Sequence, residues 1–160
     1  MSDRTSDGPA DPRRARFPRK LNVWRDSVCA GDDVDASHEI TLSNRHRTLA
    51  SVLNQLSGMG YLALIAGGRA TWVLHAAPRP SKPLAVVAQQ WSEPRCLVDP
   101  SLPVEQFLSS EPGEIDGRPR PHLEWEYLAQ TDPESVFERL RNGERISRFD
   151  ESLSWTGDLR

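Results

Sequence analysis

The densest group of side chains that could bind a metal lies in the segment CAGDDVDASHE, residues 29–39. Five oxygen or nitrogen donors suited to a hard divalent cation fall within eight residues: Asp32, Asp33, Asp35, His38 and Glu39. The spacing differs from a calcium-binding EF hand, because histidine stands where the turn needs glycine and Asn44 stands where the bidentate glutamate belongs. We therefore favour a solvated acidic loop over a cation site, and nothing in the sequence predicts a cofactor.

A second candidate chemistry pairs the thiol of Cys29 with the imidazole of His38, nine residues later. If they face each other across a β-hairpin, the imidazole could activate Cys29 as the nucleophile of a small hydrolase or transferase. Neither cysteine lies in a C-x-x-C pair, and the G-x-S-x-G, H-E-x-x-H and phosphate-loop motifs are absent. Because a free cysteine usually acts as a small buried hydrophobe, the enzyme is the alternative interpretation and a non-enzymatic role is preferred.

Acidic side chains dominate the chain after its first twenty residues. Residues 21–160 hold 14 basic and 20 acidic side chains, which gives a net charge of −6. That sign disfavours contact with a phosphate backbone, so nucleic acid is not an expected partner. It suits an inhibitor or immunity-type protein that binds a basic protein, although solubility alone would also explain it. The residues expected to contact the partner are Glu124 and Glu126 on the outer face of a strand and Asp32, Asp33 and Asp35 in the acidic loop.

The other three histidines differ in their surroundings. His75 lies in an apolar stretch and is expected to hydrogen-bond within a sheet rather than to act as a base. His46 is next to Arg47 and His122 is next to Pro121, so both are expected at the surface.

The elements that must position these residues are organised around the apolar stretch 61–91. Residues 70–77 and 84–91 have strand composition and flank a turn that contains three prolines. In the first strand Trp72, Leu74 and Ala76 alternate with Thr71, Val73 and His75. Both faces carry apolar residues, so the hairpin should lie inside a sheet rather than at its edge.

Further elements are predicted on either side of this hairpin. Residues 21–29 and 37–43 predict a hairpin that encloses the acidic loop, and residues 49–56 have the apolar period of a helix. The strongest helix signals are Asp132 before Pro133 at the start and Gly143 after the end. The remaining predicted elements are a short strand at 95–98, a short helix at 101–108, a loop at 109–121 and a strand at 122–129.

The order strand, strand, helix, strand, strand, short strand over residues 21–99 resembles the β-grasp arrangement of ubiquitin-like proteins. The resemblance implies an α+β fold with a mixed sheet and one packed helix. It also implies a role in which a sheet surface is presented to partners, which favours binding over catalysis. The strand and helix of residues 122–143 lie outside this pattern and are predicted to form a C-terminal extension.

The predicted organisation is a single α+β domain at 21–143 with a segment at each end. Residues 1–20 are predicted to be a disordered basic tail, because they contain Pro, Gly, Ser and Arg with a single aromatic. Residues 144–160 are polar, with Ile146, Phe149, Leu153 and Trp155 available to dock them. No apolar run approaches bilayer length, and the N-terminus has no signal-peptide pattern, so a cytoplasmic protein without membrane contact is expected.

Overall fold

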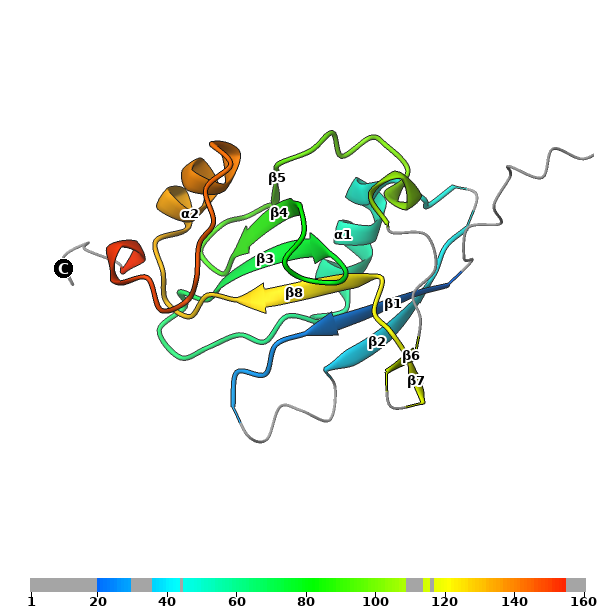
Figure 1. Cartoon of the computed structure of the whole chain (residues 1–160), viewed down its shortest axis with the longest axis horizontal. Coiled ribbons are helices and arrows are strands. Elements are labelled where there is room, and N and C mark those ends of the chain that lie inside the picture. Colours follow the sequence, from blue (N-terminus) through cyan, green and yellow to red (C-terminus); the bar gives the residue numbers. More distant parts are fainter. Residues whose placement is uncertain (1–19, 30–35, 44, 109–113, 116, 155–160) are drawn as a thin grey trace, which may run out of the picture.

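A computed structural model describes residues 20–29, 36–43, 45–108, 114–115 and 117–154. These residues form a mixed α+β fold, in which a six-stranded sheet carries two helices (Figure 1). The strand order is β2-β1-β8-β3-β4-β5. The strands are β1 (Lys20–Arg25), β2 (Ser37–Thr41), β3 (Thr71–Ala76), β4 (Pro83–Ala88), β5 (Arg95–Cys96) and β8 (Leu123–Tyr127), with a separate two-stranded ladder of β6 (Glu114–Ile115) and β7 (Arg118–Pro119).

Strand β8 lies in the middle of the sheet, between the two hairpins. It runs parallel to β1, with Trp24 opposite Glu124, and antiparallel to β3, with Leu74 opposite Trp125. The prediction that this segment belongs to a C-terminal extension is therefore wrong. The sequence order placed this segment after the predicted sheet and so suggested an extension. Its pairing with β1, about a hundred residues earlier, is a long-range contact that no local sequence pattern reveals.

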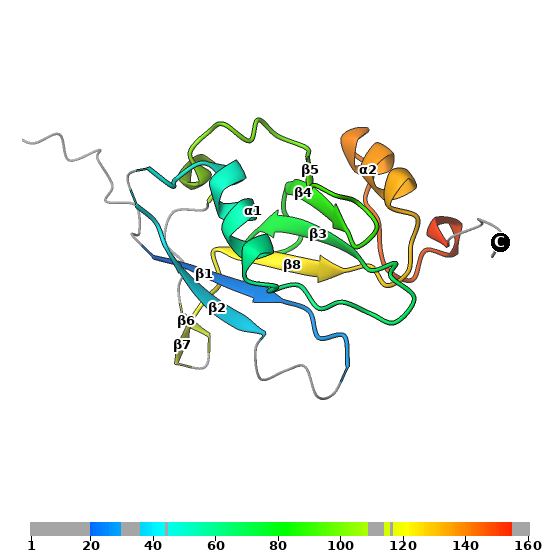
Figure 2. The same cartoon turned by 180° about the vertical axis from the view of Figure 1, so that it is seen from behind.

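Helix α1 (Leu49–Gly58) covers one face of the sheet (Figure 2). The Thr48 side chain caps its first turn by accepting a hydrogen bond from the backbone N–H of Ser51 at 3.2 Å. The helix is positioned by its apolar stripe, as the period of the sequence predicted. The side chains buried in this core include Leu49, Val52, Leu53 and Leu56 of α1 and Leu21, Val23, Ile40, Trp72, Leu74, Leu123 and Trp125 of the sheet.

Helix α2 (Pro133–Arg141) lies on the opposite face and packs against β4. Asp132 caps it by accepting from the backbone N–H of Ser135 at 3.3 Å. Val136 and Leu140 form a smaller core with Val73 and Val86. Every residue of β3 is buried, which confirms that this strand lies inside the sheet with one set of side chains toward each helix.

The C-terminal segment contributes to the smaller core through Leu153, which is fully buried. The Leu153 carbonyl accepts a hydrogen bond from the Asp132 backbone N–H at 2.8 Å, next to the start of α2. Phe149 is 79% exposed and does not anchor the segment.

Trp155 and residues 1–19 lie outside the described residues, and the first strand already begins at Lys20. Within the part of the chain that the structure describes, no helix is both long and apolar enough to cross a bilayer.

His122 lies just before β8 and is only 8% exposed, so the prediction of a surface histidine is wrong. Its Nδ1 accepts a hydrogen bond from the Asn22 backbone N–H at 2.9 Å, and its own backbone N–H donates to the Asn22 carbonyl at 2.8 Å. An accepting Nδ1 requires the neutral ring with its proton on Nε2. Burial lowers the pKa of His122 accordingly.

Because the pKa of His122 is lowered in the folded protein, this histidine binds a proton more readily in the unfolded chain. The free energy of unfolding should therefore fall as the pH drops below about 6.5, the ordinary pKa of histidine. The loss should level off once the pH is below the pKa of the folded state. Urea unfolding between pH 5 and 8 measures it. In His122→Asn, whose amide oxygen can accept the same hydrogen bond, the pH dependence over this range should be weaker. His46→Asn, a change at an exposed histidine, is the control, and an unchanged slope in His122→Asn would contradict the assignment.

Candidate functional site

Part of the sheet face opposite α1 carries no helix in the described residues (Figure 1). Since Leu21 and Val23 point into the α1 core, strand alternation turns the neighbouring residues of β1 to the other side. The same holds for β2 and β8, where Ile40 and Trp125 belong to that core. We refer to the resulting surface as the open face, and its residues are Asn22, Trp24, Ser37, Glu39, Thr41 and Glu124.

Trp24 is the one large apolar side chain of the open face. It is half-buried, belongs to neither hydrophobic core, and lies between Ser37 of β2 and Glu124 of β8 in the register of the sheet. A large aromatic ring with a polar N–H, set among polar side chains, is the type of residue that most often anchors a protein interface. The position was readable from the alternation of LNVW in the sequence, but the sequence analysis did not single it out.

An ion-pair network centred on Arg79 borders the open face. Arg79 makes a bidentate contact with Asp26, at 2.6 and 3.2 Å, and its Nε donates to Glu124 at 2.8 Å. Asp26 also accepts from the backbone N–H of Tyr127 at 3.0 Å, so the network joins the end of β1, the β3–β4 turn and β8. Burial alone would lower the pKa of Arg79, but its hydrogen bonds and ion pairs with the two carboxylates outweigh burial and raise it.

His75 and Glu126 form a second pair beside this network. The His75 Nε2 lies 3.0 Å from a Glu126 carboxylate oxygen, and Nδ1 lies 3.4 Å from the Ser81 carbonyl. A neutral ring can donate to one of these oxygens and an imidazolium to both. Both ring nitrogens of His75 thus face protein oxygens, which confirms the expectation that this histidine is hydrogen-bonded within the sheet.

The predicted acidic surface thus consists of paired rather than free carboxylates in the region that can be described. Glu124 and Glu126 share a face of β8, but their side chains are 18% and 23% exposed and contact Arg79 and His75. The sequence analysis missed these partners because one comes from a proline-rich turn and the other from a strand of the neighbouring hairpin. The remaining predicted contact residues, Asp32, Asp33 and Asp35, lie outside the described residues.

Cys29 and His38 are not cross-strand neighbours. Strand β1 ends at Arg25, and the register places His38 opposite Val23, six residues before Cys29. Cys29 is exposed, while the His38 ring lies 5.8 Å from that of Tyr61. The register therefore does not place His38 opposite the thiol of Cys29, which is the arrangement that the cysteine-dependent enzyme requires.

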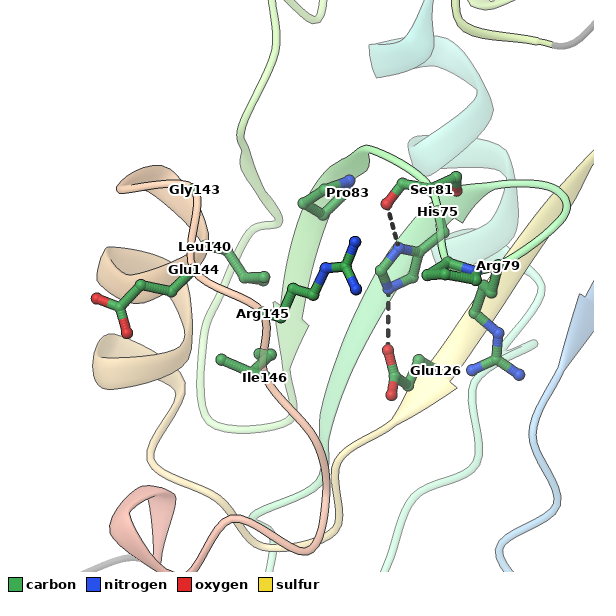
Figure 3. Close-up of a pocket in the computed structure, with 11 residues that line it drawn as sticks. His75, Arg79, Ser81, Pro83, Glu126, Leu140, Gly143, Glu144, Arg145 and Ile146 are labelled. Atoms are coloured by element: carbon green, nitrogen blue, oxygen red, sulfur yellow. Dashed lines mark hydrogen bonds and ion pairs between the residues drawn. The ribbon is translucent and has the colours of Figure 1, made fainter.

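A cavity of about 550 Å³ lies between the His75–Glu126 pair and the end of α2 (Figure 3). Its floor is His75 and Glu126, and Arg145 enters from the loop after α2 with its guanidinium directed toward His75. The apolar part of the lining is formed by Pro80, Pro83, Leu140 and Ile146. Across the described residues, no group of three or more His, Cys, Asp or Glu side chains is arranged to hold a metal ion.

Comparisons with known proteins add no functional information. No family model matches the chain, and neither a curated protein nor a solved structure is significantly similar to it. The open face and the cavity are therefore the features from which a function can be inferred.

The Arg79 network should stabilise the fold, because its three side chains are only 18–30% exposed. We expect Arg79→Gln to lower the free energy of unfolding by about 1–3 kcal/mol, between the values typical of surface and buried pairs. In a double-mutant cycle with Asp26→Asn, the two effects should be non-additive. Arg141→Gln is the matched control, because its partner Glu138 and Arg141 itself are both about half exposed. Equal small effects of Arg79→Gln and Arg141→Gln in urea unfolding would contradict a stabilising network.

Proposed function

We propose that this chain is a small non-enzymatic binding protein whose open face contacts a basic protein, in the manner of an inhibitor or immunity protein. The observation that carries the proposal is the half-buried Trp24 on a sheet face that no helix of the described residues covers. A partner that covers Trp24 would remove the exposed part of its ring from water, and such central aromatic residues supply much of the affinity at protein interfaces.

The charge around Trp24 supports a basic partner. The carboxylates on or beside the open face are Asp26, Glu39, Glu124 and Glu126, against the basic Lys20 and Arg79. Three of the four carboxylates are held by Arg79 or His75, which reduces the local field compared with free carboxylates. We therefore expect Trp24 to supply most of the affinity for the partner. The excess of carboxylates over basic side chains should mainly raise the association rate.

The finer fold assignment is part of the same proposal. We propose a β-grasp-like fold, supported by the antiparallel β1–β2 hairpin, the helix that follows it, and the parallel pairing of β8 with β1. Ubiquitin-like domains present a sheet surface to their partners, which agrees with a binding role for the open face. The two free cysteines agree with the reducing cytoplasm as the place where the protein acts.

The test uses the full chain to capture a protein from its source cell, followed by binding kinetics with the purified partner. Trp24→Ala should weaken binding at least about tenfold, mostly through faster dissociation. Association should slow as salt rises, because exposed charges are screened over about 8 Å at physiological ionic strength. Glu39→Gln should also slow association, and it is a cleaner probe than Glu124 because the Glu39 side chain is half exposed and its ion pair with Lys20 lies on the surface.

Matched controls separate the open face from general effects of charge and hydrophobicity. Phe149→Ala removes a 79% exposed aromatic side chain in the C-terminal segment, and Glu138→Gln removes a half-exposed carboxylate on α2. Both should leave binding unchanged. The proposal is overturned if the captured protein is acidic, or if it binds Trp24→Ala as tightly as the wild type while Trp24→Ala remains folded.

A further inference from the structure

We propose that the cavity beside α2 binds a small organic anion, a carboxylate or phosphate with an apolar body, whose charged group is held by Arg145. Arg79 and Glu126 line this cavity and also border the open face, but Arg145 and the apolar walls lie outside that face. Binding of a ligand to Arg145 is therefore a separate proposal from the protein partner. The volume of about 550 Å³ falls within the range of pockets that enclose small molecules.

The loop that carries Arg145 is held in place by the end of α2. Gly143 adopts a φ of +79°, a left-handed conformation that favours glycine. The backbone N–H groups of Gly143 and Glu144 donate to the carbonyls of Leu140 and Arg139, both at 3.0 Å, which is the Schellman arrangement that ends a helix. This turn directs the chain back toward the sheet, so that Arg145 reaches into the cavity (Figure 3).

Side-chain contacts reinforce the same loop. Arg139 binds the Glu144 carboxylate at 2.7 Å and the Asp150 carboxylate at 2.8 Å. Glu144 therefore points away from the cavity, as Figure 3 shows, and its charge is matched outside it. The consequence is that Arg145 is presented by a structured segment rather than by a free chain, which lowers the entropic cost of binding a ligand.

Of the four charged side chains that line the cavity, Arg79, Glu126 and Glu144 are bound to other side chains, which leaves Arg145 as the group to bind an anion. No hydrogen bond or ion pair holds the Arg145 side chain within the described residues, and in Figure 3 its guanidinium points toward His75. The carboxylate of Glu126 is already engaged by His75 at 3.0 Å. The planar guanidinium of an arginine presents paired N–H donors that match the two oxygens of a carboxylate or phosphate group.

The walls of the cavity define the rest of the ligand. Leu140 is 8% exposed and Ile146 is half-buried, and with Pro80 and Pro83 they offer apolar contacts around the charged end. A ligand with an aromatic or aliphatic body should therefore bind better than an inorganic ion of the same charge.

The experiment titrates the full chain with benzoate, phenyl phosphate and the neutral benzyl alcohol at constant ionic strength. Binding is followed by the NMR signals of the Arg145 side-chain Nε–H and the His75 ring. Fragments of this size bind weakly, so at least one anion should give saturable shifts of both residues below about 50 mM. The relative affinities of the two anions then tell whether the site prefers a carboxylate or a phosphate.

Arg145→Gln should weaken binding of that anion at least tenfold, whereas Arg148→Gln should change it less than twofold. Arg145 and Arg148 are both exposed and lie three residues apart on the same segment, but Arg148 does not line the cavity. The two variants change the net charge equally. Thermal melting checks that both variants are folded. The proposal is overturned if neither anion gives saturable shifts, if benzyl alcohol binds as well as the anions, or if both variants weaken binding equally.

Discussion

The parallel pairing of β1 with β8 is the contact on which the rest of the structure depends. It joins segments about a hundred residues apart. His122 and Asn22 exchange hydrogen bonds at its start, and the backbone N–H of Asp26 donates to the Trp125 carbonyl at its end. Through β8, the β1–β2 hairpin and the β3–β4 hairpin become one sheet. Without it, α1 would have no continuous surface to cover, and Asp26 would not meet Arg79.

The two faces of this sheet are covered unequally, and both candidate sites result from that difference. Helix α1 covers one face, where the large core residues lie. Helix α2 packs against the β4 side of the other face, and no helix of the described residues lies over the surface of β1, β2 and β8 around Trp24. The cavity forms at the boundary, where the loop after α2 approaches β3 and β8.

The features that could be predicted from sequence are those set by local patterns. The alternation of Trp72 and Leu74 with Val73 predicted a strand buried on both faces, and the capping and stop signals around 132–143 predicted α2. Both predictions are confirmed, because a strand period and a helix cap depend on residues close in sequence. The helix α1 was predicted for the same reason.

The features that the sequence analysis missed are those set by contacts between distant segments. The alternation in β8 showed that Glu124 and Glu126 share a face, but their partners Arg79 and His75 come from the other hairpin and its turn. The central place of β8 was missed for a similar reason, since a strand period does not identify the neighbouring strand. Arg145 gave no signal at all, because only the folded turn at Gly143 brings it to the cavity.

The most direct test of the central claim, that β8 is the strand that holds the sheet together, is native-state amide hydrogen exchange. The account predicts that the amides of Asp26, His122 and Leu128, which are hydrogen-bonded across the two sides of β8, exchange only by global unfolding. Their free energy of exchange should equal that of Gln89, whose amide bonds to the Ala70 carbonyl beside the β3–β4 hairpin. If the three amides exchange through a lower-energy opening while Gln89 stays protected, β8 is a detachable strand and the account is contradicted.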